Sequence, residues 1–181
     1  SQEHNLFIYG IEGISQQENE REYSMYKETV KTVTIDEDIT VIPSESFKGF
    51  KNMKIINISS TVKEITSVNV FDECESLEAI NVETSEWYKS INGVLIDIKN
   101  QTLMKYPIAK AQQEPIPSDI KILGERSFES NKYLTTINIP QKTTSIGSYA
   151  FRYCNSLKSI TVTSGNSKYS INNGALIEGG N

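Results

Sequence analysis

The chain has 181 residues, of which 37% are hydrophobic, and a formal net charge of −5. This length and composition suit one domain with a continuous core. The acidic balance argues against nucleic acid as a partner, because phosphate binding requires clustered Lys and Arg. No apolar run approaches the roughly 20 residues that are needed to cross a bilayer. We therefore expect no membrane insertion of this segment and favour a monomer.

The first thirty residues differ in pattern from the rest of the chain. Residues 6–11 form an apolar stretch that predicts a strand. Ser15 and Glu18 have the spacing of a helix-capping box, and Tyr23, Tyr26 and Val30 follow at helical spacing. We predict that residues 1–30 form an N-terminal cap with a short helix, or a structured loop in its place.

From residue 31 onward, one apolar pattern returns at nearly constant spacing. Phe47 and Phe71 are 24 residues apart, and Phe128 and Phe151 are 23 residues apart. A period of 20–29 residues is typical of leucine-rich-repeat solenoids, in which each unit buries its apolar face only against its neighbours. We therefore predict a β-rich solenoid of about six coils over residues 31–181, with the phenylalanines in an inward-facing column.

Each predicted coil contains a strand in which apolar and polar residues alternate, so the polar ones point outward. Parallel strands would stack these outward residues at about 4.8 Å, one rung per coil. Asn side chains at that spacing can bond one another, so a purely structural ladder and a recognition surface are equally compatible with the pattern. The candidate partner-binding face consists of the short polar residues in this slot: Thr34, Asn57, Asn81, Asn138 and Thr161.

An insertion interrupts the repeats near residues 88–107. Alternating stretches flank Lys99-Asn100-Gln101, which predicts a β-hairpin from about Val94 to Tyr106 that projects from the solenoid. A second copy of the first half begins at Tyr169 and stops before a returning strand, so we expect the repeat array to continue beyond this sequence. Trp87, the only tryptophan, and Tyr88 stand at the base of the insertion and form an alternative binding face. The preferred interpretation of Trp87 is packing against the hairpin.

No catalytic, cofactor or metal site assembles from the sequence. The only histidine is His4, close to the N-terminus, so a nucleophile would have no interior base. Cys74 and Cys154 occupy the same repeat position about three coils apart. Their separation would be some 14 Å from the rung spacing, which exceeds the 7 Å limit for a disulfide. We predict two free, buried thiols and a protein that is not an enzyme.

The fullest copy of the repeat contains Ile139, Pro140, Thr143, Ile146, Gly147, Ala150, Phe151, Cys154, Leu157 and Ile160. This pattern resembles the BspA-type leucine-rich repeat, which is found in surface proteins of oral and gut bacteria and of some protozoan parasites. That resemblance implies right-handed stacked coils and location at the cell surface or in the secreted fraction. It also implies non-enzymatic binding of a protein partner, as in adhesion to host, matrix or microbial proteins. The alternatives are a cytoplasmic or secreted scaffold for endogenous partners and a carbohydrate binder.

Overall fold

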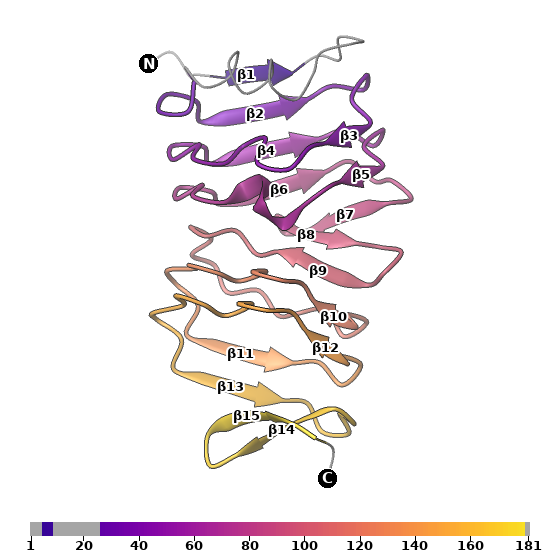
Figure 1. Ribbon diagram of the computed structural model, residues 1–181, viewed down its shortest axis with the longest axis vertical. Coiled ribbons are helices and arrows are strands. Elements are labelled where there is room, and N and C mark those ends of the chain that lie inside the picture. Colours follow the sequence, from indigo (N-terminus) through magenta and orange to yellow (C-terminus); the bar gives the residue numbers. More distant parts are fainter. Residues whose placement is uncertain (1–4, 9–25, 180–181) are drawn as a thin grey trace.

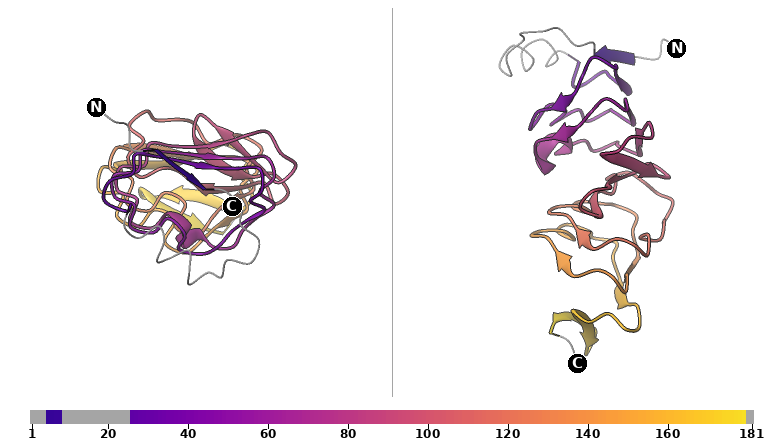
Figure 2. Two further views of the ribbon diagram at one scale, coloured as in Figure 1. Left: turned by 90° about the horizontal axis from the view of Figure 1, so that it is seen from above. Right: turned by 90° about the vertical axis from the view of Figure 1, so that its right-hand side faces the viewer.

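The computed structural model describes residues 5–8 and 26–179 as a β-solenoid whose short strands stack along the longest axis (Figure 1). The first strand, indigo, and the last strands, yellow, lie at opposite ends of this stack (Figure 2). The helix predicted around residues 15–30 falls mostly outside the described residues. The elements are β1 (Asn5–Ile8), β2 (Thr32–Ile35), β3 (Val41–Ile42), β4 (Ile55–Ile58), β5 (Glu64–Ile65), the 3-10 helix η1 (Val68–Phe71), β6 (Ala79–Val82), β7 (Tyr88–Ile91), β8 (Val94–Asp97), β9 (Thr102–Lys105), β10 (Ile122–Leu123), β11 (Thr136–Ile139), β12 (Ser145–Ile146), β13 (Ser159–Val162), β14 (Tyr169–Asn172) and β15 (Ala175–Glu178).

The longer strands form one wall of the solenoid, in two parallel sections. The first section has the order β1-β2-β4-β6, and the second pairs β11 with β13. Alternate residues of these strands point inward, and Val33, Ile56 and Ile80 are fully buried there. β1 pairs in parallel with β2 and so covers the outer edge of the first coil. We call this surface the long-strand wall.

The two-residue strands and β9 form a second wall, in which β3 pairs with β5, and β10 pairs with β9 on one side and β12 on the other, all in parallel. The coil after β5 has one more residue before its phenylalanine than its neighbours have. The 3-10 helix η1 accommodates this residue, and the Ser67 hydroxyl caps it by accepting a hydrogen bond from the Asn69 N–H. The extra residue therefore changes the local turn and leaves the stacking of the coils intact.

The turns on the third side carry an interior column of aromatic rings, as the repeat predicted. Phe47 and Phe71 stack with their ring centres 6.3 Å apart, and Phe128 lies 5.5 Å from Phe151. Tyr106 also belongs to this column, because its ring stacks on Phe128 at 5.2 Å. Its N–H donates to the carbonyl of the residue before Phe128, just as the Phe128 N–H donates to the residue before Phe151. The coil without a phenylalanine thus uses a tyrosine in the same position.

The predicted hairpin exists, but the expectation that it projects from the solenoid is wrong. β8 and β9 pair antiparallel, and β7 joins them through the Asn92-Gly93 turn. β9 then pairs in parallel with β10, so the insertion is a continuous part of the second wall. Gly93 is required at the turn: its φ is +80°, and a Cβ there would lie 2.8 Å from the Cβ of Ala79.

β8 also joins the two halves of the core. Leu95 packs with the N-terminal cluster of buried residues, whereas Val94 and Ile96 pack with the C-terminal cluster. All three side chains are buried, because the strand has apolar neighbours on both faces. The insertion therefore supplies the connection between two apolar cores that the regular repeats form on either side of it.

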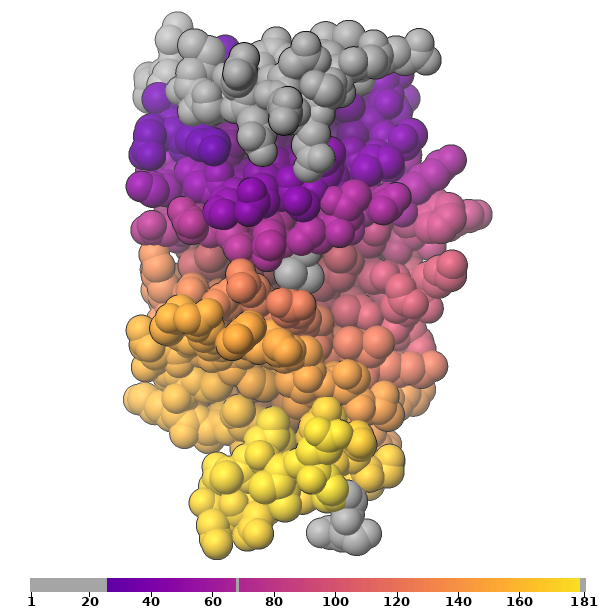
Figure 3. Space-filling view, viewed as in Figure 1, coloured from indigo at the N-terminus to yellow at the C-terminus, as the bar shows by residue number. Residues whose placement is uncertain are grey.

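The C-terminal coil is less completely buried than the coils before it. Phe151, Cys154 and Leu157 are only partly buried, whereas Phe128 and Leu134 of the preceding coil are fully buried. The antiparallel pair β14–β15 follows and forms the narrower lower end of the molecule (Figure 3). The apolar interior is thus thinnest at this end of the described residues.

Replacement of Phe128 with Ala should lower the free energy of unfolding by about 3–5 kcal/mol, because the ring is buried between Tyr106 and Phe151. The same change at Phe151 should cost distinctly less, since that ring is only partly buried. Equilibrium urea unfolding measures both, and Tyr133→Ala, at an exposed ring, is the control. Equal losses at Phe128 and Tyr133 would contradict the assignment of the column.

Candidate functional site

The candidate residues of the N-terminal coils form a hydrogen-bonded ladder on the long-strand wall. Thr34, Asn57 and Asn81 lie directly opposite one another in β2, β4 and β6. The Asn81 side-chain N–H donates to the Asn57 Oδ1 at 3.0 Å. Asn57 in turn donates to the Thr34 hydroxyl at 3.4 Å. These bonds orient the amides and still leave donors and acceptors directed to solvent, because an amide can form four hydrogen bonds.

The candidate residues of the C-terminal coils form a second, shorter ladder. Asn138 and Thr161 lie opposite each other in β11 and β13. The Thr161 hydroxyl donates to the Asn138 Oδ1 at 3.1 Å, and the Asn138 amide donates to the Thr163 hydroxyl at 3.0 Å. Both Asn138 and Thr161 are exposed. The predicted face is therefore divided into two sections of the same chemical character.

The insertion and an irregular segment separate the two ladder sections. Gln113 spans part of this interval, because its amide bonds the hydroxyls of Thr135 and Thr136 at the start of β11. Farther back along the chain, the Asn92 amide donates to Glu114 at 2.9 Å. Side-chain amides thus continue the polar character of the wall where regular rungs are missing.

A hollow of about 280 Å³ lies at the C-terminal ends of β2, β4 and β6. Its wall includes all three N-terminal ladder residues and, at one end, the Glu83 carboxylate. The Ser59 hydroxyl in its lining bonds the Asp36 carbonyl at 3.1 Å, so this margin is polar and held in place. The hollow is lined by Thr34, Ile35, Asn57, Ile58, Ser59, Asn81, Val82 and Glu83.

The alternative face at Trp87 and Tyr88 divides into one exposed and one buried residue. Trp87 is 37% exposed, so it is less fully packed against the hairpin than the sequence suggested. Tyr88 is buried, and its hydroxyl accepts a hydrogen bond from the Ile65 N–H at 3.0 Å. Tyr88 is consequently a structural residue between coils and is unavailable to a partner.

The two cysteines are free, as predicted, but only one of them is fully buried. Burial raises the pKa of the Cys74 thiol to about 12. Cys154 lies in the less buried terminal coil, and burial raises its pKa as well. Each thiol donates to the carbonyl of the phenylalanine one coil earlier, Phe47 and Phe128 respectively. Their role is to close the corner between coils.

Among the described residues, no group of three His, Cys, Asp or Glu side chains could hold a metal ion. His4 lies outside that part of the chain. No helix within the described ranges is long and apolar enough to span a bilayer.

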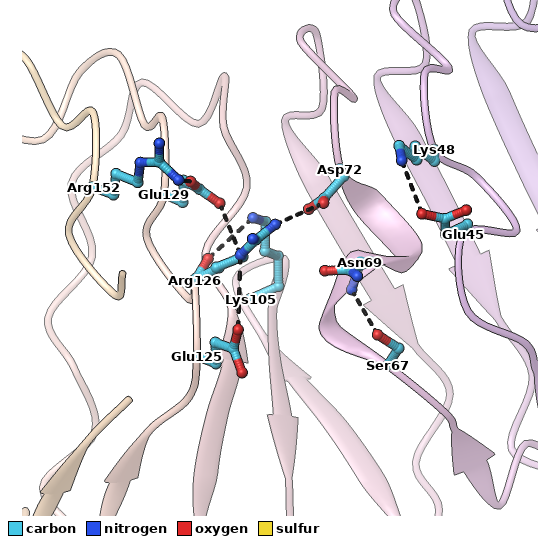
Figure 4. Close-up of polar contacts among 10 residues, drawn as sticks. All are labelled: Glu45, Lys48, Ser67, Asn69, Asp72, Lys105, Glu125, Arg126, Glu129 and Arg152. Atoms are coloured by element: carbon cyan, nitrogen blue, oxygen red, sulfur yellow. Dashed lines mark hydrogen bonds and ion pairs between the residues drawn. The ribbon is translucent and has the colours of Figure 1, made fainter. Parts of the chain in front are cut away.

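A polar cluster lies at the junction of the two cores (Figure 4). Arg126 donates to the Asp72 carboxylate at 3.1 Å and thereby links two coils through residues that are 54 positions apart in the sequence. Its Nε lies 3.7 Å from Glu129, whose carboxylate is also 3.9 Å from Arg152. The charges therefore alternate along the third side of the solenoid, in the order Asp72, Arg126, Glu129, Arg152.

Lys105 is the one member of this junction whose charge is poorly accommodated. It precedes Tyr106 in the column, at a position where other coils have Val70, Ser127 or Ala150. The side chain is buried, and its Nζ donates to the Arg126 carbonyl at 3.2 Å. Burial lowers the pKa of Lys105, although the nearby carboxylates of Asp72 and Glu129 oppose the shift.

The profile of the BspA type leucine rich repeat region matches the chain with six copies, over residues 18–93 and 90–177. The chain belongs to the BspA-type leucine-rich-repeat family. A search of curated proteins gave no significant match.

Solved structures of leucine-rich-repeat proteins resemble this BspA-type solenoid. A leucine rich cell surface protein from Faecalibacterium prausnitzii is 26% identical, with a TM-score of 0.69 over 91% of this chain and 45% of that one. The pneumococcal vaccine antigen PcpA is 28% identical, with a TM-score of 0.67 over 74% of this chain and 34% of PcpA. A protein from Eubacterium ventriosum shares the fold at 21% identity, with a TM-score of 0.51 over 75% of this chain and 54% of that one. The chain thus spans less than half the length of the first two.

Sequence reasoning missed the exposed aromatic and Arg side chains of this BspA-type solenoid. The candidate face was chosen from strand alternation, and that criterion ignores the turns. Tyr149 and Tyr153 flank Phe151 in the terminal coil and are both exposed. The available signal was their position two residues before and two residues after the phenylalanine of the repeat, since Arg126 and Ser130 stand in the same two positions around Phe128.

Replacement of Lys105 with Met should raise the free energy of unfolding at neutral pH by roughly 1 kcal/mol, since a buried charge is removed. Asp72 and Glu129 keep their arginine partners, so no carboxylate is left unpaired. The folded-state pKa of Lys105 is lowered, so the native protein binds fewer protons than the unfolded chain and gains stability as pH rises toward 10.5. The advantage of the variant should therefore shrink with increasing pH.

Urea unfolding at several pH values measures this difference. The control is Lys99→Met, at an exposed lysine in the turn between β8 and β9. Loss of stability in the Lys105 variant at neutral pH would show that the charge supports the junction.

Proposed function

We propose that this chain is a non-enzymatic protein-binding module of a cell-surface protein, and that the long-strand wall binds the partner. The observation that carries the proposal is the in-register ladder of Thr34, Asn57 and Asn81 beside a hollow on a rigid sheet. Two proteins of similar structure support the proposal, because one is a leucine rich cell surface protein and the other is a vaccine antigen. Adhesion to host, matrix or microbial proteins is the finer form of this function.

The chemistry of the ladder suits an extended protein segment. An Asn side chain presents a donor and an acceptor much as a peptide group does, so it can bond the main chain of a partner. The bonds between rungs hold the amides in place before binding, which reduces the side-chain entropy lost on association. The hollow beside Asn57 and Asn81 can take one side chain of that segment, with Glu83 at its margin.

The ladder contains no Trp, Tyr or Arg, the residues that dominate tight interfaces. Binding energy is therefore spread over several rungs, and each amide contributes modestly. This distribution favours a partner that runs along the stack and contacts both ladder sections. Because no single rung dominates, a mutational test of the wall should alter more than one rung.

Introduction of lysines at Asn81 and Asn138 together should abolish binding to the wall, because long charged side chains would cover both ladder sections. Both positions are exposed, so the free energy of unfolding should change by less than about 1 kcal/mol. The assay is biolayer interferometry of the chain against purified matrix and plasma proteins, including fibronectin, fibrinogen, laminin and collagen.

The matched control is the double variant Thr40→Lys and Thr144→Lys. These residues are exposed and precede the short strands β3 and β12, a position that Lys63 and Lys121 occupy in other coils. The control adds the same charge and should bind like the parent. Equal binding by the ladder variant would place the contact elsewhere, and absence of binding to every protein tested would contradict the adhesive role.

A further inference from the structure

Two tyrosines and two arginines form a surface patch on the third side of the solenoid, away from the long-strand wall. Tyr149 and Tyr153 are 55% and 58% exposed, the highest fractions among the large hydrophobic residues described. The Arg152 guanidinium lies over both rings, 5.1 Å from the centre of Tyr149 and 4.4 Å from that of Tyr153. Arg126 approaches Tyr149 at 5.7 Å. We call Arg126, Tyr149, Arg152 and Tyr153 the tyrosine–arginine patch.

The repeat itself explains how these side chains come to the surface. Tyr149 and Tyr153 stand two residues before and two residues after the inward-facing Phe151. Both have positive φ, 60° and 58°, as do Arg126 and Ser130 around Phe128. The backbone conformation at these positions is thus the same in the two coils, whereas the side chains differ. The two last coils place aromatic and Arg residues where earlier coils have Glu45 or Asn69.

The patch lies in a basic part of an acidic protein. Residues 115–168 contain seven Lys or Arg and three Asp or Glu, a net charge of +4, in a chain whose total is −5. Glu129, which lies between the two arginines, is only 13% exposed, so its carboxylate is beneath them. The Arg152 side chain is 41% exposed and its guanidinium lies beside this carboxylate (Figure 4). Arg126 also pairs with Asp72 and with the half-exposed Glu125, so the accessible positive charge of the patch is that of Arg152.

Arg152 is held in one orientation before any partner arrives. Its Nη2 donates to the Tyr153 hydroxyl at 2.6 Å, and its Nη1 lies 3.9 Å from Glu129. A guanidinium has five N–H donors, so several remain for a carboxylate, which it can bind through two parallel bonds. Its fixed position reduces the entropy lost on binding, and the flanking rings supply apolar contact area.

We propose that the tyrosine–arginine patch is a second binding surface, which takes an acidic segment of a protein partner. Charge complementarity selects an anionic partner, and the combination of Tyr with Arg is the composition of protein-binding hot spots. A carboxylate of the segment pairs with Arg152 while adjacent side chains pack on Tyr149 and Tyr153. This surface is independent of the ladder, because it lies on the turns around the aromatic column.

The experiment uses an array of synthetic 12-residue peptides that combine Asp or Glu with aromatic and aliphatic residues, each beside a version with Asn or Gln in place of the acids. Acidic peptides should bind the chain more tightly than their amide versions, and binding should weaken as salt increases. Fluorescence polarisation of the best peptides then compares variants of the chain. Arg152→Ala should weaken binding at least tenfold. Tyr149→Ala and Tyr153→Ala should each weaken it severalfold.

Two controls separate the patch from general effects. Tyr133→Ala removes another exposed tyrosine, whose ring has none of the described arginines over it, and should leave binding unchanged. Arg152→Lys keeps the charge but not the planar donor geometry, so it should bind nearly as weakly as Arg152→Ala. The ladder variant with Lys at 81 and 138 should bind acidic peptides like the parent, so that failure of one surface is distinguishable from failure of the other.

The proposal is overturned if no acidic peptide binds more tightly than its amide version, or if Arg152→Ala binds like the parent. Single-stranded DNA and heparin are tested in the same assay. If either binds more tightly than every peptide and loses binding in Arg152→Ala, the patch is a site for a polyanion and the assignment to a protein segment is wrong.

Discussion

The structure depends on one constraint: each coil can bury its apolar residues only against the coils beside it. The aromatic column expresses this most directly, since Phe128 is enclosed by Tyr106 on one side and Phe151 on the other. Main-chain bonds between coils keep the same register, from the aromatic turns to the long strands. Because the register is shared, polar residues in one repeat position align on the surface. The ladder is therefore a consequence of how the core is built.

The same scaffold displays two surfaces of different chemistry. The long-strand wall offers short amides and hydroxyls that are already bonded to one another, as between Asn57 and Asn81. The turns of the last two coils offer rings and guanidinium groups, with Arg152 lying over the rings of Tyr149 and Tyr153. The first surface suits a segment that runs along the stack, and the second suits a local charged contact. A repeat protein can separate such functions because surface side chains vary while the interior positions stay constant.

The sequence predicted the solenoid, the column and the ladder positions because each follows from a period. Features outside the period were not predictable in the same way. Tyr106 follows its aligned strand residue Leu103 by three positions, whereas Phe128 follows Leu123 by five, so alignment by spacing could not identify it. The burial of β8 had a signal, the unbroken apolar run of residues 94–96, which indicates a strand covered on both faces. Burial of Lys105 had none, because only the three-dimensional junction places a lysine there.

The central claim is that each coil is stabilised by packing against the coils beside it. Hydrogen exchange of backbone amides tests this claim most directly. Amides of β4, which pairs with β2 and β6, and of β6, which contacts β4, β7 and β8, should exchange most slowly. Protection should decrease through β13 and be lowest in β14 and β15, where the core is thinnest. Amides of β15 that exchange as slowly as those of β4 would contradict the account, because the terminal hairpin would then owe its stability to something other than stacked neighbours.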